Sequence, residues 1–291
     1  MALDWAVVAV CVLAAVVVGA VRVLPRPVVL VGLWGVCVAC GVAAFGLLME
    51  LVTLVFNQTV DRWSSAVSQA LAAVGVVVLV VVARDYWRVS AGVCSRCGSV
   101  HGVSTRWVVP GPSAAPRWVR RVAWVGVAGF VPYAAMKTTW ALGGTFAGLT
   151  HADLVAGASA SWAALESFGV DPTALLAALG VFLLLGLVRP WGQVFPRWTV
   201  WLAGRRVPRW LPLAPALVGA ATLAPYGVFG VGLVVLESVG VVPVERGQFR
   251  SVADALVVSW CGLGAFCCFG VALAVAAWSY LVRTRRRCVS V

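Results

Sequence analysis

Apolar residues fill seven runs along the chain, and segments with polar or charged residues separate each run from the next. The runs cover residues 5–21, 28–49, 66–83, 122–142, 173–188, 211–236 and 255–280. Most approach the roughly 20 residues that a helix needs to cross the hydrocarbon of a bilayer. Backbone groups in lipid must be paired within their own segment, so even the Val-rich runs are predicted to be helical. The pattern predicts an all-α polytopic membrane protein with seven transmembrane helices.

The composition supports this interpretation. The chain has 291 residues, of which 62% are hydrophobic and 11% are charged, whereas about a quarter of the residues in a soluble domain are charged. This excludes a soluble enzyme, a secreted disulfide-rich module and a disordered tail. We expect a single transmembrane domain over residues 1–291, located in the inner (plasma) membrane as a multi-pass protein.

The charges predict the orientation. Alternate connections between the runs carry 18 Arg and one acid, Asp85, whereas the remaining connections carry three Arg and nine acids. Basic residues beside a span are retained in the cytoplasm. We therefore expect the N-terminus outside, the C-terminus in the cytoplasm, a cytoplasmic connection over residues 84–121 and a basic cytoplasmic tail over residues 283–291. This topology accounts for the net charge of +12 without nucleic acid, and it places the Arg clusters where they attract anionic lipid head groups.

Three spans begin with a similar sequence. Pro25-Arg26, Pro116-Arg117 and Pro208-Arg209 follow one another at intervals of 91 and 92 residues. Because all three lie on the predicted cytoplasmic side, they suggest a parallel repeat, with a leader helix followed by three helical hairpins. A chain so rich in Ala, Val, Leu, Gly, Pro and Arg can also produce such matches by composition alone.

The only lysine, Lys137, lies within the fourth run. An ionisable residue at membrane depth is costly, and it indicates a functional site by default. Its expected partners are Glu50 and Glu237, which end the second and sixth runs on the same side. Alternatively, the long side chain extends to the head groups without a function.

Proline stands in the middle of two runs, as Pro132 and Pro225, and each removes a helical hydrogen bond. The carbonyls freed in this way can bind a ligand, although an ordinary packing kink is the alternative. A tyrosine follows each proline. The sequence therefore predicts a ligand-binding site among spans 2, 4 and 6, formed by Lys137, Glu50, Glu237, Tyr133 and Tyr226.

Cys94 and Cys97 have the spacing of half a zinc ribbon, with His101 close behind. A tetrahedral zinc site needs a fourth ligand, and Cys288 in the tail is the remaining cysteine predicted on that side. A redox pair or no function at all are the alternatives. The cysteines within the spans are expected to pack as small apolar residues: Cys11, Cys37, Cys40, Cys261, Cys267 and Cys268.

Catalytic signatures are absent from the sequence. It has no phosphate-binding Gly-x-x-x-x-Gly-Lys loop, no Gly-x-Ser-x-Gly elbow and no His-Glu-x-x-His motif. The two histidines, His101 and His151, are too few for a haem, copper or non-haem iron centre, and they are predicted on opposite sides. We therefore expect no cofactor other than zinc, and a function that is not enzymatic.

The segment Arg-Pro-Trp-Gly-Gln-Val-Phe-Pro-Arg-Trp at residues 189–198, followed by Gly-Arg-Arg-Val-Pro at 204–208, resembles a pattern in uncharacterised multi-pass membrane proteins of high-GC bacteria. Some of these proteins carry the label of ring-opening dioxygenases of the LigA type. The resemblance covers mainly residues 115–215, and it implies a small integral membrane protein.

Two function classes follow from these features. The first is a protein that binds or transports a small solute or ion at the site among spans 2, 4 and 6. The second is a membrane-embedded regulator or assembly partner that contacts a cytoplasmic protein through its Arg-rich loops and Cys94, Cys97 and His101. A lipid-modifying or redox enzyme is a third and weaker alternative.

Overall fold

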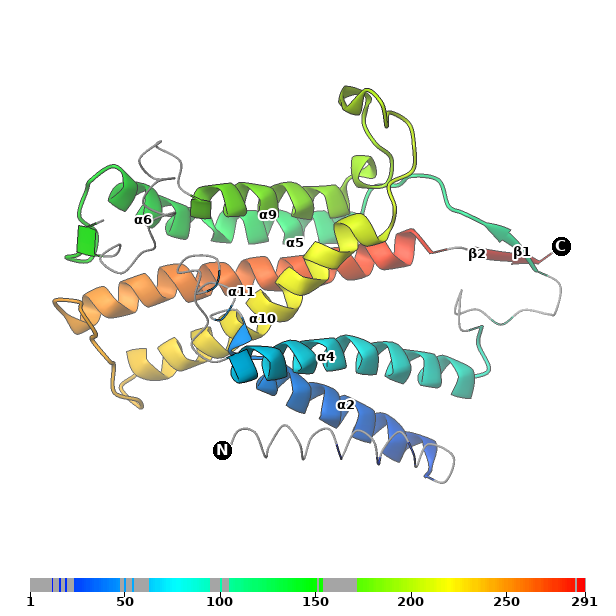
Figure 1. Ribbon diagram of the computed structural model, residues 1–291, viewed down its shortest axis with the longest axis horizontal. Helices are drawn as coiled ribbons and strands as arrows, with labels where there is room; N and C mark the ends of the chain where they lie inside the picture. The colour runs from blue at the N-terminus through cyan, green and yellow to red at the C-terminus, as the bar shows by residue number, and fades with distance from the viewer. Residues whose placement is uncertain are drawn as a thin grey trace. The chain divides into compact units, whose positions relative to one another are not determined.

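The computed structural model describes residues 24–47, 50, 63–94, 100, 105–150, 152–153, 172–285 and 287–290, together with the single residues 12, 16, 19 and 54. The described chain is predominantly α-helical (Figure 1). It forms two compact units. Unit 1 contains α2, α4 and a short β-pair, and unit 2 contains α5, α6, α9, α10 and α11.

Four of the described helices are long and apolar enough to cross a membrane: α2 (Arg26–Ala43), α4 (Trp63–Ser90), α10 (Trp210–Ser238) and α11 (Val252–Arg283). They correspond to the second, third, sixth and seventh predicted runs, so the membrane-embedded character of the protein is supported. The first predicted span, over residues 5–21, lies almost entirely outside the described residues. The count of seven spans and their orientation stay predictions.

The fourth predicted run is not one helix. It forms α5 (Arg117–Gly129) and α6 (Val131–Ala141), with a break at Phe130. Pro132 lies in the first turn of α6, where its missing N–H removes no helical bond. The fifth run becomes α9 (Pro172–Val188), a helix of 17 residues. Pro225, in contrast, lies inside the continuous helix α10.

The repeated Pro-Arg pairs mark helix starts. Pro25 and Pro116 are the residues immediately before α2 and α5, with ψ angles of 143° and 154°. Proline fixes φ near the helical value and disfavours a helical conformation in the residue before it, so it favours a start at this position. Pro208 lies two residues before α10. The three starts agree with the sequence pattern, and the repeat itself stays a prediction.

Unit 1 is built on the pair α2 and α4. Val29, Leu33 and Val36 of α2 are buried against Leu79 and Ala83 of α4. The described mid-span cysteines of α2, Cys37 and Cys40, are also buried in this cluster, as expected for small apolar side chains. In addition, β1 (Thr105–Val108) pairs antiparallel with β2 (Arg287–Ser290).

Helix α11 is the centre of unit 2, because it packs against α5, α6, α9 and α10. The closest approach is to α10, where glycines allow the two backbones to meet. A Cβ atom on Gly227 would lie 2.2 Å from the backbone nitrogen of Cys267, and one on Gly270 would lie 2.4 Å from that of Ala224. Small residues at such crossings are typical of helices that associate in lipid.

The end of α9 is held by two other segments of unit 2. The N–H of Ala115 donates to the carbonyl of Val188 at 2.9 Å, and the Arg283 guanidinium donates to the carbonyls of Leu187 and Ser113. The fully buried Tyr280 donates its hydroxyl to the carbonyl of Gly192 at 2.9 Å. The last carbonyls of a helix have no partner within it, and here donors from before α5 and from the end of α11 supply them.

We predict that Gly227→Ala destabilises unit 2, because the added methyl group must push the backbone of α11 away. Overpacking of this kind costs about 1–3 kcal/mol of unfolding free energy. The measurement is denaturant unfolding of the purified protein in mixed micelles, followed by circular dichroism.

Gly232→Ala is the matched control. It lies in the same helix, and a Cβ atom there would meet nothing within 4 Å. This variant should unfold at or slightly above the denaturant concentration of the wild type, since Ala favours the helix over Gly. Equal stability of the two variants would contradict the close crossing of α10 and α11.

Candidate functional site

The two tyrosines singled out by the sequence meet in unit 2. Tyr133 of α6 and Tyr226 of α10 both contact the ring of Phe266 on α11, with centroid distances of 5.7 Å and 6.0 Å. Phe130, at the break between α5 and α6, extends the cluster, because its ring lies 5.6 Å from Tyr133 and 4.9 Å from Phe269. Three helices therefore contribute to one aromatic cluster, formed by Phe130, Tyr133, Tyr226, Phe266 and Phe269.

Lys137 lies one helical turn beyond Tyr133 on α6. Its ammonium nitrogen lies 6.0 Å from the centroid of the Tyr133 ring and 5.7 Å from that of Trp140. A cation within about 6 Å of an aromatic ring is attracted by the ring quadrupole. These two rings stabilise the ammonium of the half-buried Lys137 beside the aromatic cluster.

Trp140 is held in place by its own hydrogen bonds. The indole N–H is shared between the carbonyls of Phe146 and Leu149, at 3.3 Å and 3.1 Å, and the side chain is buried. The loop that supplies these carbonyls turns back through Gly143 and Gly148, whose φ angles of 77° and 73° favour glycine. The ring beneath the ammonium of Lys137 is therefore fixed by the loop that follows α6.

The loop ends in a small polar cluster. The backbone N–H and the hydroxyl of Thr150 donate to one carboxylate oxygen of Asp153, at 2.8 Å and 2.7 Å. These hydrogen bonds, with a smaller contribution from the positive charge of Arg250, lower the pKa of the exposed Asp153 carboxyl.

The two glutamates do not share one unit. Glu237 lies in the last turn of α10, in unit 2, whereas Glu50 belongs to unit 1. One oxygen of Glu50, Oε2, is buried without a hydrogen-bond partner in the described part of the chain. The pairing of Lys137 with either carboxylate stays a prediction.

The predicted metal ligands are described only in part. Cys94 is a half-buried cysteine in unit 1, and Cys97 and His101 lie outside the described residues. Cys288 lies in β2, where its Cα pairs in register with that of Trp107 in β1. The β-pair thus joins the basic tail to the connection that carries Cys94. Among the residues that the structure describes, no three potential ligands form a metal site, and zinc stays a prediction.

Phe266 and Trp140 were missed by the sequence analysis. Neither carries a charge or belongs to a motif, and aromatic residues are common in apolar runs. Only the packing of α6, α10 and α11 shows that Phe266 joins the two tyrosines.

Comparison with known proteins gives no match: no family model, no curated protein and no solved structure is similar to this chain. Function is therefore inferred from the geometry of the described residues.

We predict that Thr150→Val raises the pKa of Asp153 toward the ordinary aspartate value of about 3.9. The variant loses the hydroxyl donor, which makes the largest contribution to the lowered pKa. The pKa can be measured by carbon-13 NMR titration of labelled aspartate carboxyls in micelles.

The direction of the pH effect follows from the lowered pKa. Asp153 stabilises the fold at pH values above the ordinary pKa of aspartate, and this contribution is lost as the pH falls through the lowered value. Thr145→Val is the control, because Thr145 is exposed in the same loop and the described structure shows no hydrogen bond from its hydroxyl to Asp153. An unchanged Asp153 titration in Thr150→Val would contradict the hydrogen-bonded turn.

Proposed function

We propose that this protein is a multi-pass protein of the inner (plasma) membrane that binds or transports a small solute or ion through unit 2. The observation that supports the proposal is the convergence of Tyr133 and Tyr226 on Phe266, with the ammonium of Lys137 one turn further along α6. These groups combine a positive charge, two hydroxyls and aromatic rings at a junction of three helices.

The chemistry of these groups favours a small organic anion. The ammonium attracts a carboxylate or a similar negative group, because opposite charges attract more strongly near a protein surface than in bulk water. The aromatic rings favour an apolar body, and the tyrosine hydroxyls can donate to the ligand. A few polar groups on an otherwise apolar wall are typical of small-molecule sites.

We predict that Lys137→Met abolishes anion binding at this site while the fold is retained. The probes are benzoate, hexanoate and chloride, and the measurement is the shift that each causes in the thermal unfolding midpoint of the purified protein. At a concentration 100 times its Kd, a ligand stabilises the folded state by about 2.7 kcal/mol. We expect at least one of the organic anions to raise the midpoint of the wild type.

Lys137→Arg is the matched control, because it keeps the charge on a long side chain and should keep the shift. Tyr226→Phe removes one hydroxyl and should weaken binding by about five- to tenfold, the value of one hydrogen bond. The proposal fails if none of the anions stabilises the wild type, or if Lys137→Met responds as the wild type does.

A second function is favoured by the β-pair. The pairing of β1 with β2 joins the predicted cytoplasmic connection to the basic tail within unit 1. Such a cytoplasmic module would suit a regulator or assembly partner that contacts another protein through its Arg-rich loops, stabilised by zinc on Cys94, Cys97 and His101.

For this second function we predict about one zinc per chain in the purified protein, measured by elemental mass spectrometry. Cys94→Ser should lower the zinc content below about 0.2 per chain, because a structural site that loses a thiolate loses most of its affinity. Cys261→Ser, within α11, should leave it unchanged. Wild-type protein with less than about 0.2 zinc per chain would remove the metal from this second function.

The two functions can be separated with the same variants. If Lys137→Met keeps the ligand-induced shift while Cys94→Ser abolishes capture of a cytoplasmic partner, solute binding at Lys137 is wrong and the regulator is favoured.

A further inference from the structure

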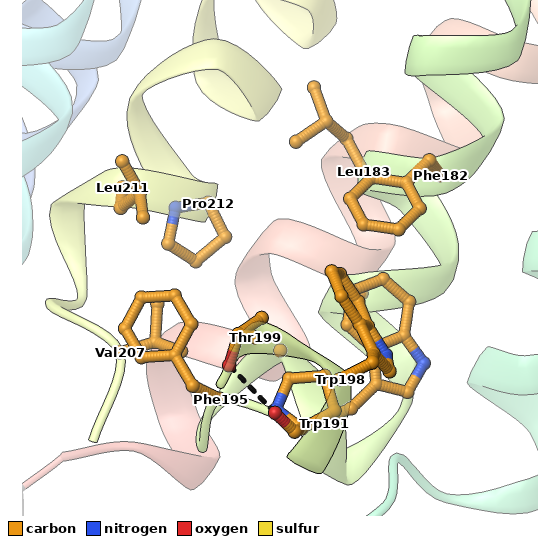
Figure 2. A pocket seen from close by; sticks show the side chains of 12 residues that line it. Phe182, Leu183, Trp191, Phe195, Trp198, Thr199, Val207, Leu211 and Pro212 are labelled. Atoms are coloured by element: carbon orange, nitrogen blue, oxygen red, sulfur yellow. Dashed lines mark hydrogen bonds between the residues drawn. The ribbon is translucent and has the colours of Figure 1, made fainter. Parts of the chain in front are cut away.

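A second feature of unit 2 lies between the end of α9 and the start of α10. A pocket of about 320 Å³ is lined by Phe182 of α9, by Trp191, Phe195 and Trp198 of the following segment, and by Leu211 and Pro212 of α10 (Figure 2). This volume is at the lower end of the roughly 300–1,000 Å³ that small-molecule sites occupy. The pocket lies in the Arg-Pro-Trp-Gly segment singled out by the sequence, for which the site at Lys137 gives no role.

The pocket is built by defined contacts. The Trp191 ring packs against Phe182 at a centroid distance of 4.7 Å, with the two ring planes tilted by 36°. A Cβ atom on Gly192 would lie 1.9 Å from the carbonyl oxygen of Gly186, so this approach of the segment to α9 requires glycine. The buried hydroxyl of Tyr280 fixes the Gly192 carbonyl from α11. Such a preformed site binds a ligand without first having to order its walls.

The segment from 193 to 207 is folded back on itself. The N–H of Phe195 donates to the carbonyl of Arg205 at 2.9 Å, and the N–H of Val207 donates to that of Gln193 at 3.0 Å. Gln193 in turn exchanges two hydrogen bonds with the backbone of Ser113. These bonds hold the backbone of Arg205 beside that of the lining residue Phe195.

The lining offers little to a polar ligand. Its one hydroxyl, on Thr199, donates to the carbonyl of Pro196 at 2.7 Å, as the dashed line in Figure 2 shows. The remaining lining is aromatic and aliphatic. The interior of the pocket therefore fits a hydrocarbon chain.

The surroundings of the pocket are strongly basic. Residues 189–209 contain five Arg and no acid. Arg197 stands between the lining residues Pro196 and Trp198, and both Arg197 and Arg205 are exposed. Trp198, Trp201 and Trp210 are 69%, 90% and 67% exposed. Exposed tryptophan beside arginine is typical of a segment at the level of lipid head groups.

We propose that this pocket holds one acyl chain of an anionic phospholipid, whose phosphate is bound by Arg197 and Arg205. The apolar lining accounts for the chain, and the excess of arginine accounts for the charge of the head group. This is a defined lipid site on α9, α10 and the segment between them. It is independent of solute binding at Lys137.

The test uses the full-length protein in nanodiscs of phosphatidylcholine. These contain a trace of phosphatidylglycerol with a diazirine at the end of one acyl chain, and the labelled peptides are mapped after illumination. We expect the label to concentrate on residues 182–212. An excess of unlabelled phosphatidylglycerol should remove it, whereas the same excess of phosphatidylcholine should not. Lys137→Met should label as the wild type does.

Two sets of variants test the chain and the head group separately. Val207→Trp fills the pocket and should lower labelling of residues 182–212 about tenfold, a loss equivalent to about 1.4 kcal/mol. Val228→Trp on α10, where the wild-type side chain is 50% exposed, should not.

Arg197→Gln and Arg205→Gln should each lower the preference for phosphatidylglycerol about fivefold. Arg117→Gln and Arg121→Gln, which make the same change in charge on α5, should leave it unchanged.

Several results would overturn the proposal. The first is a label spread evenly over the spans, and the second is equal competition by phosphatidylcholine. The third is a diazirine-bearing alkane that labels the pocket as efficiently as phosphatidylglycerol does, which would assign the pocket to neutral hydrocarbon. Wild-type labelling of Val207→Trp would also do so. If Val207→Trp fails to fold, the lipid competition on the wild type and the arginine variants decide the question.

Discussion

The buried carbonyl oxygens at the end of α9 need hydrogen-bond donors other than water, and two other segments of unit 2 supply them. The Arg283 guanidinium reaches the carbonyls of Leu187 and Ser113 from the last residue of α11. Because these carbonyls are buried, few water molecules could replace the donors. A buried carbonyl without a hydrogen-bond partner lowers the stability of the fold. One side chain therefore joins the end of α9, the segment before α5 and the end of α11.

Both candidate sites depend on α11. At one end, Tyr280 donates to Gly192 in the segment that lines the acyl-chain pocket, and Arg283 donates to Leu187 at the end of α9. In the middle, Phe266 contacts the two tyrosines of α6 and α10. Helix α11 can serve both because small residues let its neighbours approach closely: Gly227 meets it from α10, and Gly126 meets its Ala272 from α5.

The sequence was sufficient to predict the helices but not their contacts. Lipid imposes helical structure on any apolar run of suitable length, so α2, α4, α10 and α11 were expected close to where they are found. Pro132 indicated an interruption or a kink in the fourth run, but not that two helices, α5 and α6, would meet at Phe130. The β-pair was not predicted, because it joins four-residue strands about 180 residues apart, and such distant pairings leave no local pattern. Tyr133 and Tyr226 were identified from the positions of two prolines, whereas the aromatic residue that unites them carries no signal in the sequence.

The break at Phe130 separates two helices that are held in different ways. Gly126 and Gly129 of α5 lie so close to α11 that a methyl group on either would meet Ala272 or Cys268 at 2.4 Å or 2.6 Å, so α5 cannot slide along its neighbour without steric conflict. Helix α6, which carries Lys137, contacts α11 through the rings of Tyr133 and Phe266. Because α6 begins anew at Val131, the direction of the helix that carries the ammonium is not imposed by the glycine contacts that fix α5.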